Sequence, residues 1–556
     1  FPYPIEDLPE TVRVNLLGCA GADTGDRGGR VNCIPLSPRE IPSLILSGAI
    51  PVDVAMVHTS RPDPGGKLSL GVWVHALHAA TGRASIVMAQ VNSFMPRVHG
   101  NGFITMDRVD FIFPADGPLP SPVPPEDDDD IAGQIGARLA GLVSDGDTLQ
   151  VGPGSLPDQA LRFLDGRKHL GVHTEVLTEG IVGLMKEGAV DNSMKTLNRG
   201  KTVCSCCEVS EESRRYIDDN PFIETRPVDY TNDQAVIGAQ RGLVAVNTVR
   251  EIDLTGQADG DDDNDGALST PCSTDFTRGA ALSPDGKSVI VISSTRNGGA
   301  LSRIVPFLPE GAGVTVNRGD AQFVITEYGM ACLKGKNIRE RAMELIGIAH
   351  PAFRPWLIDE AKKAGLIYKD QRYISSALYP DYLEKARTTP KGVSLLLRPV
   401  KISDEALLKE FFYSLSDRSV YRRFMTNIDA FHHEVLQQFS TIDYSREMMI
   451  LALDVRTRPF REKVLGTGQY IAQKNGAYAE AAFAVRDDCH NAGIGHALAA
   501  HLAFCARRAG IRGFRASVFA ENKSMLRVFE KLGFDARVEY VHGVIEITMD
   551  FDVKTP

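Results

Sequence analysis

The sequence lacks long apolar stretches and lacks an excess of positive charge. No uninterrupted apolar run approaches the ~18 residues that a membrane-spanning helix needs, and no charged amino-terminal segment leads into an apolar core. We therefore expect no membrane partner and a cytoplasmic location. The 61 basic residues are outnumbered by 71 acidic residues, which gives a net charge of -10. Because binding to phosphates requires clustered Lys and Arg, this balance argues against nucleic acid as a partner.

The sequence also lacks the cysteine pattern of a disulfide framework. Its nine cysteines are odd in number and scattered over a long chain. Cys204, Cys206 and Cys207 do cluster, but the residues Thr202–Cys206 are typical of a buried strand. No His or Cys follows this cluster at zinc-ligand spacing, so structural cysteines are favoured over a metal site. We expect no metal.

Length and composition predict a globular enzyme of several domains. The 556 residues suffice for about three domains, and 43% hydrophobic residues suffice for their cores. The proline-rich stretch Pro118–Pro125 runs into the acidic stretch Glu126–Asp130, which is typical of a linker. Composition changes again at Lys391. We therefore predict domains at 1–125, 130–386 and 392–556.

Strands and helices alternate along the first two predicted domains. Such alternation indicates an α/β fold, with a largely parallel sheet and helices on its faces. The predicted helices include Arg39–Ser47 and Glu211–Ile217. The predicted strands and apolar segments include Val52–Val57, Leu70–Val74, Ala84–Val91 and Leu243–Asn247.

A glycine-bearing turn follows one of the predicted strands. The strand Asp147–Val151 runs into Gly152-Pro153-Gly154, and a helix follows. A turn of this kind can bind an anion, because unpaired N–H groups and the helix dipole point at the ligand. Pro157 stands where the dinucleotide fingerprint requires a third glycine, so we expect no nicotinamide cofactor.

Glu175 is the candidate nucleophile. It comes just after the short apolar strand Leu170–Val172, and open α/β sheets place their ligands at the carboxyl edge of such strands. The alternative is a solvated loop glutamate, since most carboxylates are surface groups.

Seven short motifs occur in an order that resembles one known family. They are Gly152-Pro153-Gly154-Ser155-Leu156-Pro157, His173-Thr174-Glu175, Asp218-Asp219-Asn220-Pro221, Tyr230-Thr231-Asn232-Asp233, Asp253-Leu254-Thr255-Gly256-Gln257, Thr326-Glu327-Tyr328-Gly329 and Ile348-Ala349-His350-Pro351. In this order they resemble the acetyl-CoA hydrolase/transferase family of CoA-transferases. The resemblance extends from about residue 30 to about residue 385 and implies two related α/β domains with an active site between them.

The resemblance implies roles for six of these residues. Glu175 would attack the acyl-CoA thioester, and Asn232 would donate to the developing oxyanion. Glu327 and Gly329 would lie near the acyl or CoA site, and the turn at Gly152 and Gly154 would help to bind CoA. The alternative for Asn232 is an ordinary cap or turn asparagine.

The expected chemistry suits a glutamate. A carboxylate with an ordinary pKa near 4.3 is ionised at pH 7 and can form a mixed anhydride, which CoA then converts to a glutamyl thioester. An acceptor carboxylate or water completes the cycle. Because a carboxylate is a weak nucleophile toward a thioester, binding energy from the remote CoA moiety has to lower the barrier. CoA is thus expected as a substrate.

The sequence departs from this family in two places. The family has a glycine-rich turn before an Asp-Phe pair; here Asp275-Phe276 is present, but residues 269–274 read Ser-Thr-Pro-Cys-Ser-Thr. Loss of a backbone N–H there would weaken oxyanion stabilisation, and proline has no N–H. The family also carries a first strand, turn and helix before the match begins, so we expect a truncated first domain. The chain begins with Phe1 rather than methionine, which leaves open what precedes it.

The third predicted domain carries a second set of motifs. His490-Asn491-Ala492-Gly493-Ile494-Gly495 opens a helix, and backbone N–H groups at such a turn can bind pyrophosphate. With the neighbouring strands, this turn resembles the GNAT N-acetyltransferases, most closely the bacterial protein-lysine acetyltransferases, over about residues 392–554. His490, Asn491, Gly493 and Gly495 would bind acetyl-CoA. His490 replaces the usual Gln or Arg of the family.

The GNAT resemblance also implies a catalytic base. Glu480 matches a glutamate that deprotonates the amine directly or through water. The alternative is a strand-edge carboxylate that faces solvent, because a strand presents every second residue to one face. Asn522 fits the second motif of the family. Phe529 stands where many members have a tyrosine that protonates the CoA thiolate.

We therefore predict a fused α/β enzyme in which both parts use acyl-CoA. The first part would be a CoA-transferase or acetyl-CoA hydrolase of acetate metabolism, with a small carboxylate or water as acceptor. The second would acetylate an amine or a protein lysine. The alternative is a CoA-transferase impaired at residues 269–274 that binds CoA and supports an active acetyltransferase. The acyl group, the amine and any homo-oligomer are left open.

Overall fold

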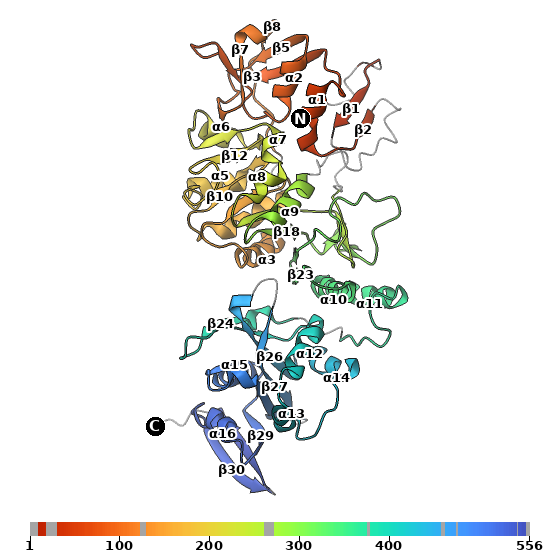
Figure 1. The fold of residues 1–556 in the computed structure, drawn as a ribbon, viewed down its shortest axis with the longest axis vertical. Coiled ribbons are helices and arrows are strands. Elements are labelled where there is room, and N and C mark those ends of the chain that lie inside the picture. The colour runs from red at the N-terminus through yellow and green to blue at the C-terminus, as the bar shows by residue number, and fades with distance from the viewer. Residues whose placement is uncertain are drawn as a thin grey trace. The chain divides into compact units, whose positions relative to one another are not determined.

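The computed structural model describes most of the chain, which forms two compact units (Figure 1). The first unit comprises Phe1–Lys334 with Ile348–His350, and the second comprises Gly335–Gly347 with Pro351–Pro556. Residues 123–128 of the predicted linker lie outside the described residues. The division into three domains stays a prediction. The described residues are 9, 11–17, 31–122, 129–260, 272–374, 379–457, 462–473, 476–541 and 543–551.

A six-stranded sheet forms the centre of the first unit. Its order is β10-β9-β15-β18-β22-β23; the first five strands are parallel and β23 is antiparallel to β22. The helices α3 (Asp129–Ala140) and α9 (Cys272–Leu282) pack against it. Strands buried on both faces are expected to be apolar, and most residues of this sheet are, although Gln150 and Lys287 are buried polar exceptions. The strands are β9 (Thr148–Val151), β10 (Gly171–Val172), β15 (Leu243–Asn247), β18 (Lys287–Val291), β22 (Phe323–Thr326) and β23 (Gly329–Cys332).

A second, smaller parallel sheet of the first unit is formed by β3 (Val54–Thr59), β5 (Ile86–Val91) and β8 (Phe111–Pro114). Residues of β3 and β5 form a local core with Leu77 of α2 (Leu77–Arg83) packed against it. A separate small cluster joins α1 (Ile41–Ser47) to α2. The predicted alternation of strands and helices is therefore confirmed here.

The segment Leu70–Val74 differs from the predicted pattern. The strand is β4 (Lys67–Ser69), paired with β7 (Phe103–Thr105), and Leu70–Val74 turns instead of continuing it. Gly71 makes the turn feasible, because its φ is +61° and a Cβ there would lie 2.2 Å from Met95 Sδ. Apolar residues in this segment are buried, so the pattern alone favoured a strand.

An eight-stranded sheet forms the centre of the second unit. Its order is β24-β25-β26-β27-β28-β29-β31-β30, and every pair is antiparallel except β28 with β29. Helix α15 (Ile494–Arg508) packs on one face, and α12 (Glu405–Tyr413) and α14 (His433–Ser440) pack on the other. The strands are β24 (Lys385–Thr388), β25 (Ser394–Pro399), β26 (Glu447–Asp454), β27 (Val464–Ala472), β28 (Tyr478–Val485), β29 (Gly513–Phe519), β30 (Asp535–Val541) and β31 (Val544–Asp550).

The parallel pair β28 and β29 separates along its length. Among the described residues its pairing runs only from Tyr478 to Glu480, opposite Gly513 to Arg515, although both strands continue. Two strands that diverge in this way leave a wedge at the sheet between them. The turn before α15 follows β28 in the chain and is tied to the end of that strand by the hydrogen bond of His490 to the carbonyl of Val485.

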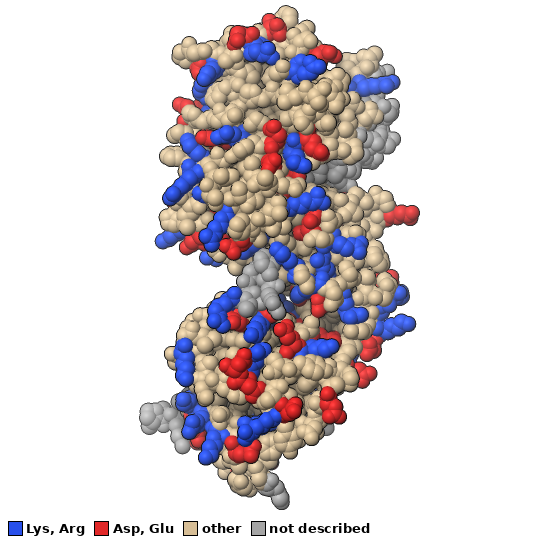
Figure 2. Space-filling model, in the orientation of Figure 1, with Lys and Arg blue, Asp and Glu red and all other residues tan. Residues whose placement is uncertain are grey.

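On the face shown in Figure 2, the described Lys and Arg side chains are interspersed with Asp and Glu over both units.

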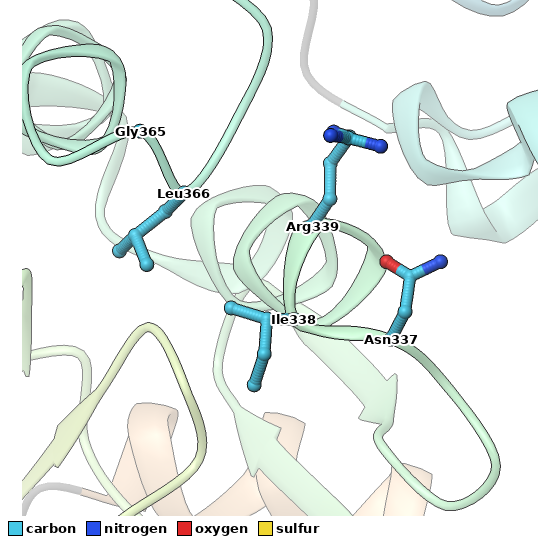
Figure 3. A pocket seen from close by; sticks show the side chains of 5 residues that line it. All are labelled: Asn337, Ile338, Arg339, Gly365 and Leu366. Carbon is cyan, nitrogen blue, oxygen red and sulfur yellow. The ribbon is translucent and has the colours of Figure 1, made fainter.

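A pocket of about 280 Å³ in the second unit is lined by residues at the start of α10 (Ile338–Ile348) and after α11 (Arg354–Lys363) (Figure 3). It contains none of the predicted site residues. Within the described part of the chain, no helix has the length and apolar character needed to cross a membrane.

Candidate active sites

Glu175 lies at the carboxyl edge of the central sheet of the first unit. It occupies the link between β10 and β11 (Val176–Thr178), and its side chain is buried. The backbone N–H groups of Ser205 and Cys206 donate to its carbonyl oxygen at 2.8 and 3.0 Å. Glu175 is thus not a solvated loop residue.

The same two hydrogen bonds explain why the predicted strand Thr202–Cys206 is wrong in detail. The segment forms β12 (Thr202–Cys204) and β13 (Cys206–Glu208), which join different sheets and meet at Ser205. Because Ser205 and Cys206 both donate to one carbonyl, the chain has to bend between the two strands. The cysteines are buried, as the sequence suggested.

Asn232 contacts the carboxylate of Glu175. It ends the short helix α7 (Val228–Thr231), and its Nδ2 donates to Glu175 Oε2. The hydroxyl of Thr231 donates to Asn232 Oδ1 at 2.9 Å, which fixes the amide with its NH₂ group toward the glutamate. The structure therefore brings these two predicted residues together, 57 positions apart in the sequence.

His173 holds the turn that carries Asn232. The ring is fully buried, and Nε2–H donates to the carbonyl of Thr231 at 2.9 Å. Burial, with a smaller effect from the nearby Lys195, lowers the pKa of His173 to about 3. A neutral imidazole is the expected state near neutral pH, because burial and the positive charge of Lys195 outweigh the hydrogen bond to Thr231, which favours the imidazolium.

Two further buried residues, one beside Glu175 and one under the strand before it, were not predicted. His75 Nε2 lies 3.6 Å from Glu175 Oε1, and the ring is buried and stacks on Trp73. Lys195 is 4% exposed, and its Nζ donates to the carbonyls of Val172 and Lys201 at 2.6 and 2.7 Å. Burial lowers the pKa of Lys195 to about 7, despite the opposing charge of Glu224. Neither residue belongs to a motif, so only the fold reveals them.

The glycine turn follows β9, which pairs with the strand β10 before Glu175, so both lie at the same edge of the sheet. Gly154 has φ +127°, a conformation that favours glycine, and precedes α4 (Ser155–Ala160). A Cβ on Gly152 would lie 2.4 Å from Asn247 Oδ1, so a side chain does not fit. The turn matches the predicted strand, turn and helix; its predicted contact with CoA stays a prediction.

Glu327 and Gly329 form the turn between β22 and β23, at the end of another parallel strand of this sheet. The buried carboxylate of Glu327 accepts the backbone N–H of Ser294 at 2.9 Å and the hydroxyl of Ser294. Gly329 has φ +153°. These hydrogen bonds of Glu327 are to Ser294 and not to Glu175, and its role near CoA stays a prediction.

The altered turn at residues 269–274 lies half outside the described residues, which begin again with Cys272 at the start of α9. The Thr274 hydroxyl donates to the carbonyl of Thr315 at 2.6 Å. The following residue, Asp275, is buried, and burial raises its pKa, with a smaller contribution from the negative charge of Glu175. The start of α9 is therefore electrostatically close to the proposed nucleophile.

The predicted site of the second unit lies along β28 and the turn that follows it. Glu480 is the last residue of β28 that pairs with β29, and it is exposed. His490 donates from Nε2 to the carbonyl of Val485 at 3.1 Å, which ties the turn to the end of β28. Asn491 and Gly493 have φ +60° and +86°, and Gly495 lies in the first turn of α15.

Asn522 and Phe529 belong to helix α16 (Lys523–Glu530). The Asn522 side chain caps this helix, accepting the N–H of Met525 at 3.4 Å. Phe529 is buried in the core of the unit, with its ring 5.8 Å from that of Phe483. A ring in this position packs against the sheet and supplies no acid.

Three parts of the chain match known family models. Residues 22–123 match the acetyl-CoA hydrolase/transferase N-terminal domain, residues 210–361 match the C-terminal domain of that family, and residues 394–535 match the acetyltransferase (GNAT) domain. The predicted resemblance to both families is thereby confirmed.

Individual relatives agree with these matches. A 4-hydroxybutyrate coenzyme A transferase of Clostridium kluyveri is 40% identical over 364 residues, which cover 65% of this chain and 84% of the relative. The crystal structure of a 4-hydroxybutyrate CoA-transferase from Porphyromonas gingivalis is 35% identical, with a TM-score of 0.55, and the match covers 64% of this chain and 88% of that one.

The carboxyl-terminal part has relatives of its own. An acetyltransferase of Pseudomonas aeruginosa is 30% identical over 143 residues, which cover 26% of this chain and 76% of the relative. CoA-transferases and GNAT enzymes both use CoA thioesters as substrates. The chain therefore belongs to the acetyl-CoA hydrolase/transferase family of CoA-transferases and carries a GNAT acetyltransferase domain.

Proposed function

We propose that the first unit transfers CoA between acyl groups through a covalent intermediate on Glu175. The observation that supports this most directly is the environment of the carboxylate, which is buried at the sheet edge and hydrogen-bonded by Asn232 on one oxygen. A carboxylate that is fixed and desolvated in this way is prepared to attack, because little rearrangement of solvent or side chain has to precede the reaction.

The proposed cycle needs no oxidant and no metal. An oxygen of Glu175 attacks the thioester carbon, the C–S bond breaks, and CoA leaves as the thiolate. The thiolate then attacks Cδ of the resulting anhydride. The Cδ–O bond breaks, the acyl group leaves as a carboxylate, and a glutamyl-CoA thioester remains. An acceptor carboxylate reverses these steps to form a new acyl-CoA, whereas water would release free CoA.

We propose a separate acetyl transfer to an amine in the second unit, with protein lysine among the acceptors. The separated strands β28 and β29 suit the pantetheine arm of acetyl-CoA, because an extended ligand with amide groups can add to an open strand. The turn before α15 would hold the pyrophosphate. Glu480 lies where the strands separate, within reach of an amine that enters from solvent, and would remove its proton.

Chemical trapping tests the first proposal. The protein is incubated with a panel of acyl-CoAs, with and without acetate, and is then reduced with borohydride and digested for mass spectrometry. We expect reduction of Glu175 to the alcohol and no modification in Glu175→Gln. CoA transfer in this variant should fall by about 10³-fold or more, since the nucleophile is lost. Glu187→Gln, which changes an exposed carboxylate close by, is the matched control.

The same samples separate this proposal from a CoA-binding scaffold that supports the acetyltransferase. That alternative is favoured by residues 269–274, where proline replaces an N–H donor in the turn. Binding of CoA by calorimetry, without any trapped adduct and without exchange of thioesters, would establish the scaffold and disprove the covalent mechanism.

A further inference from the structure

We propose that His75 is a catalytic residue of the first site, which acts on the oxygen of Glu175 that attacks the thioester. This inference rests on the proposed covalent role of Glu175. His75 is not part of any motif, and it comes from the segment before α2, 100 residues away from the nucleophile in the sequence.

The two carboxylate oxygens of Glu175 have different neighbours. Oε2 accepts the hydrogen bond from Asn232, whereas Oε1 faces His75 Nε2 at 3.6 Å, beyond hydrogen-bond length. The lone pairs of Oε1 are therefore less engaged than those of Oε2. Since a hydrogen bond withdraws the electron density that an attack needs, Oε1 is the better nucleophile.

The backbone of His75 is held in the correct place by both segments that build the site. Its N–H donates to the carbonyl of Ser205 at 3.3 Å, and its carbonyl accepts the N–H of Val228 at 3.1 Å. Ser205 is the residue whose own N–H donates to Glu175, and Val228 begins the helix that ends at Asn232. A displacement of either segment would thus also displace the imidazole.

The conformation of His75 indicates that this position is maintained at a cost in free energy. Its φ is +31°, in the left-handed region that a non-glycine residue rarely adopts. Such strain is kept only where the surroundings impose it, and it is concentrated at functional sites. Trp73 covers one face of the ring, with ring centroids 5.6 Å apart, and limits its rotation.

The position of the imidazole defines its chemical role. When Oε1 has joined the acyl group, this oxygen bridges the anhydride. The CoA thiolate then attacks Cδ, the Cδ–Oε1 bond breaks, and the electron pair goes to Oε1 of the departing carboxylate. His75 Nε2–H faces this oxygen and would donate to it as the negative charge develops, while Asn232 stabilises the charge on Oε2 in the tetrahedral intermediate.

Two substitutions test this role against a purely structural one. His75→Gln keeps an N–H donor, and His75→Phe keeps the ring without a donor. We expect His75→Phe to slow formation of the trapped glutamyl-CoA by about 10²-fold in a single turnover, and His75→Gln to recover about tenfold of that loss. The affinity for acyl-CoA and the melting temperature should stay close to wild type in both. His78→Phe, on α2, is the matched control.

Each outcome decides the matter. If Glu175→Gln is inactive while His75→Phe forms the adduct at the wild-type rate, the inference about His75 is overturned and the nucleophile stands. If both His75 variants lose acyl-CoA affinity and melting temperature together, the residue is structural and the inference also fails. If Glu175→Gln transfers CoA normally, the proposed function itself fails, and the role of His75 with it.

Discussion

Glu175 and Glu480, the two carboxylates to which we assign chemistry, lie in opposite surroundings. Glu175 is buried and is contacted by residues that are 57 and 100 positions away in the sequence. Glu480 is exposed on a strand, and the turn thought to bind its cofactor follows within fifteen residues. A nucleophile that forms a covalent bond requires a fixed position, whereas a base that takes a proton from an incoming amine requires access.

The two sites are also stabilised in different ways. The first site depends on a chain of contacts, from His173 through Thr231 to Asn232 and then Glu175. The second depends on local backbone conformation, with positive φ at Asn491 and Gly493. A substitution should therefore affect distant parts of the first site, but only its own position in the second.

After loss of the nucleophile itself, the largest effect is expected from Asn232→Ala. This change removes the donor to Glu175 Oε2, and we expect CoA transfer to fall by about 10²–10³-fold, as for loss of one oxyanion donor. Acetyl transfer, measured on the same sample, should be unchanged. Asn101→Ala, at an exposed position, is the matched control. Equal rates for Asn232→Ala and wild type would show that the hydrogen bond has no part in the reaction.

A smaller effect is expected from Glu480→Gln in the second unit. Loss of the base should lower acetyl transfer to an amine by about 10²-fold, with the affinity for acetyl-CoA and the CoA transfer of the first unit both retained. Glu539→Gln, on the exposed strand β30, serves as the control. Unchanged turnover over the whole pH range would refute the assignment of the base and leave Glu480 as a solvent-facing carboxylate.

The smallest effect is expected on the pH dependence of the free energy of unfolding, through Lys195. Its pKa is about 7 when folded, against 10.5 when exposed. Between these values the unfolded chain binds more protons than the folded one, so the free energy of unfolding should rise with pH, by at most about 1.4 kcal/mol per pH unit. Lys195→Met should remove this slope, because methionine does not titrate.

The measurement can be confined to the first unit. Trp73 lies in that unit, so its fluorescence in a Trp356→Phe background follows denaturant unfolding there. The free energy of unfolding is measured with Lys195 and with Lys195→Met in this background, at several pH values from about 7 to about 10. The difference between the two isolates the contribution of Lys195 from those of other groups. An identical slope in both would mean that the buried amine stays charged in the folded protein, and would refute its lowered pKa.

Much of the fold could be predicted from local pattern. The helix Glu211–Ile217 and the strand Leu243–Asn247 have the predicted bounds, because each is a continuous element with clear ends. Leu70–Val74 and Thr202–Cys206 were assigned wrongly in detail. Both are buried apolar segments whose bends are set by contacts with distant residues, and an apolar run does not show where a bend falls.

The sequence by itself determined the two families, the fold class, and the pair Glu175 and Asn232, since these depend on short motifs that are contiguous in the chain. Only the tertiary structure decided that His75 belongs to the same site and that Lys195 is buried beneath the strand that leads to Glu175. His75 is held by backbone contacts with Ser205 and Val228, and Lys195 donates to the carbonyl of Val172, which no local pattern encodes. Proximity across 100 residues is a property of packing, and packing exists only once the chain has folded.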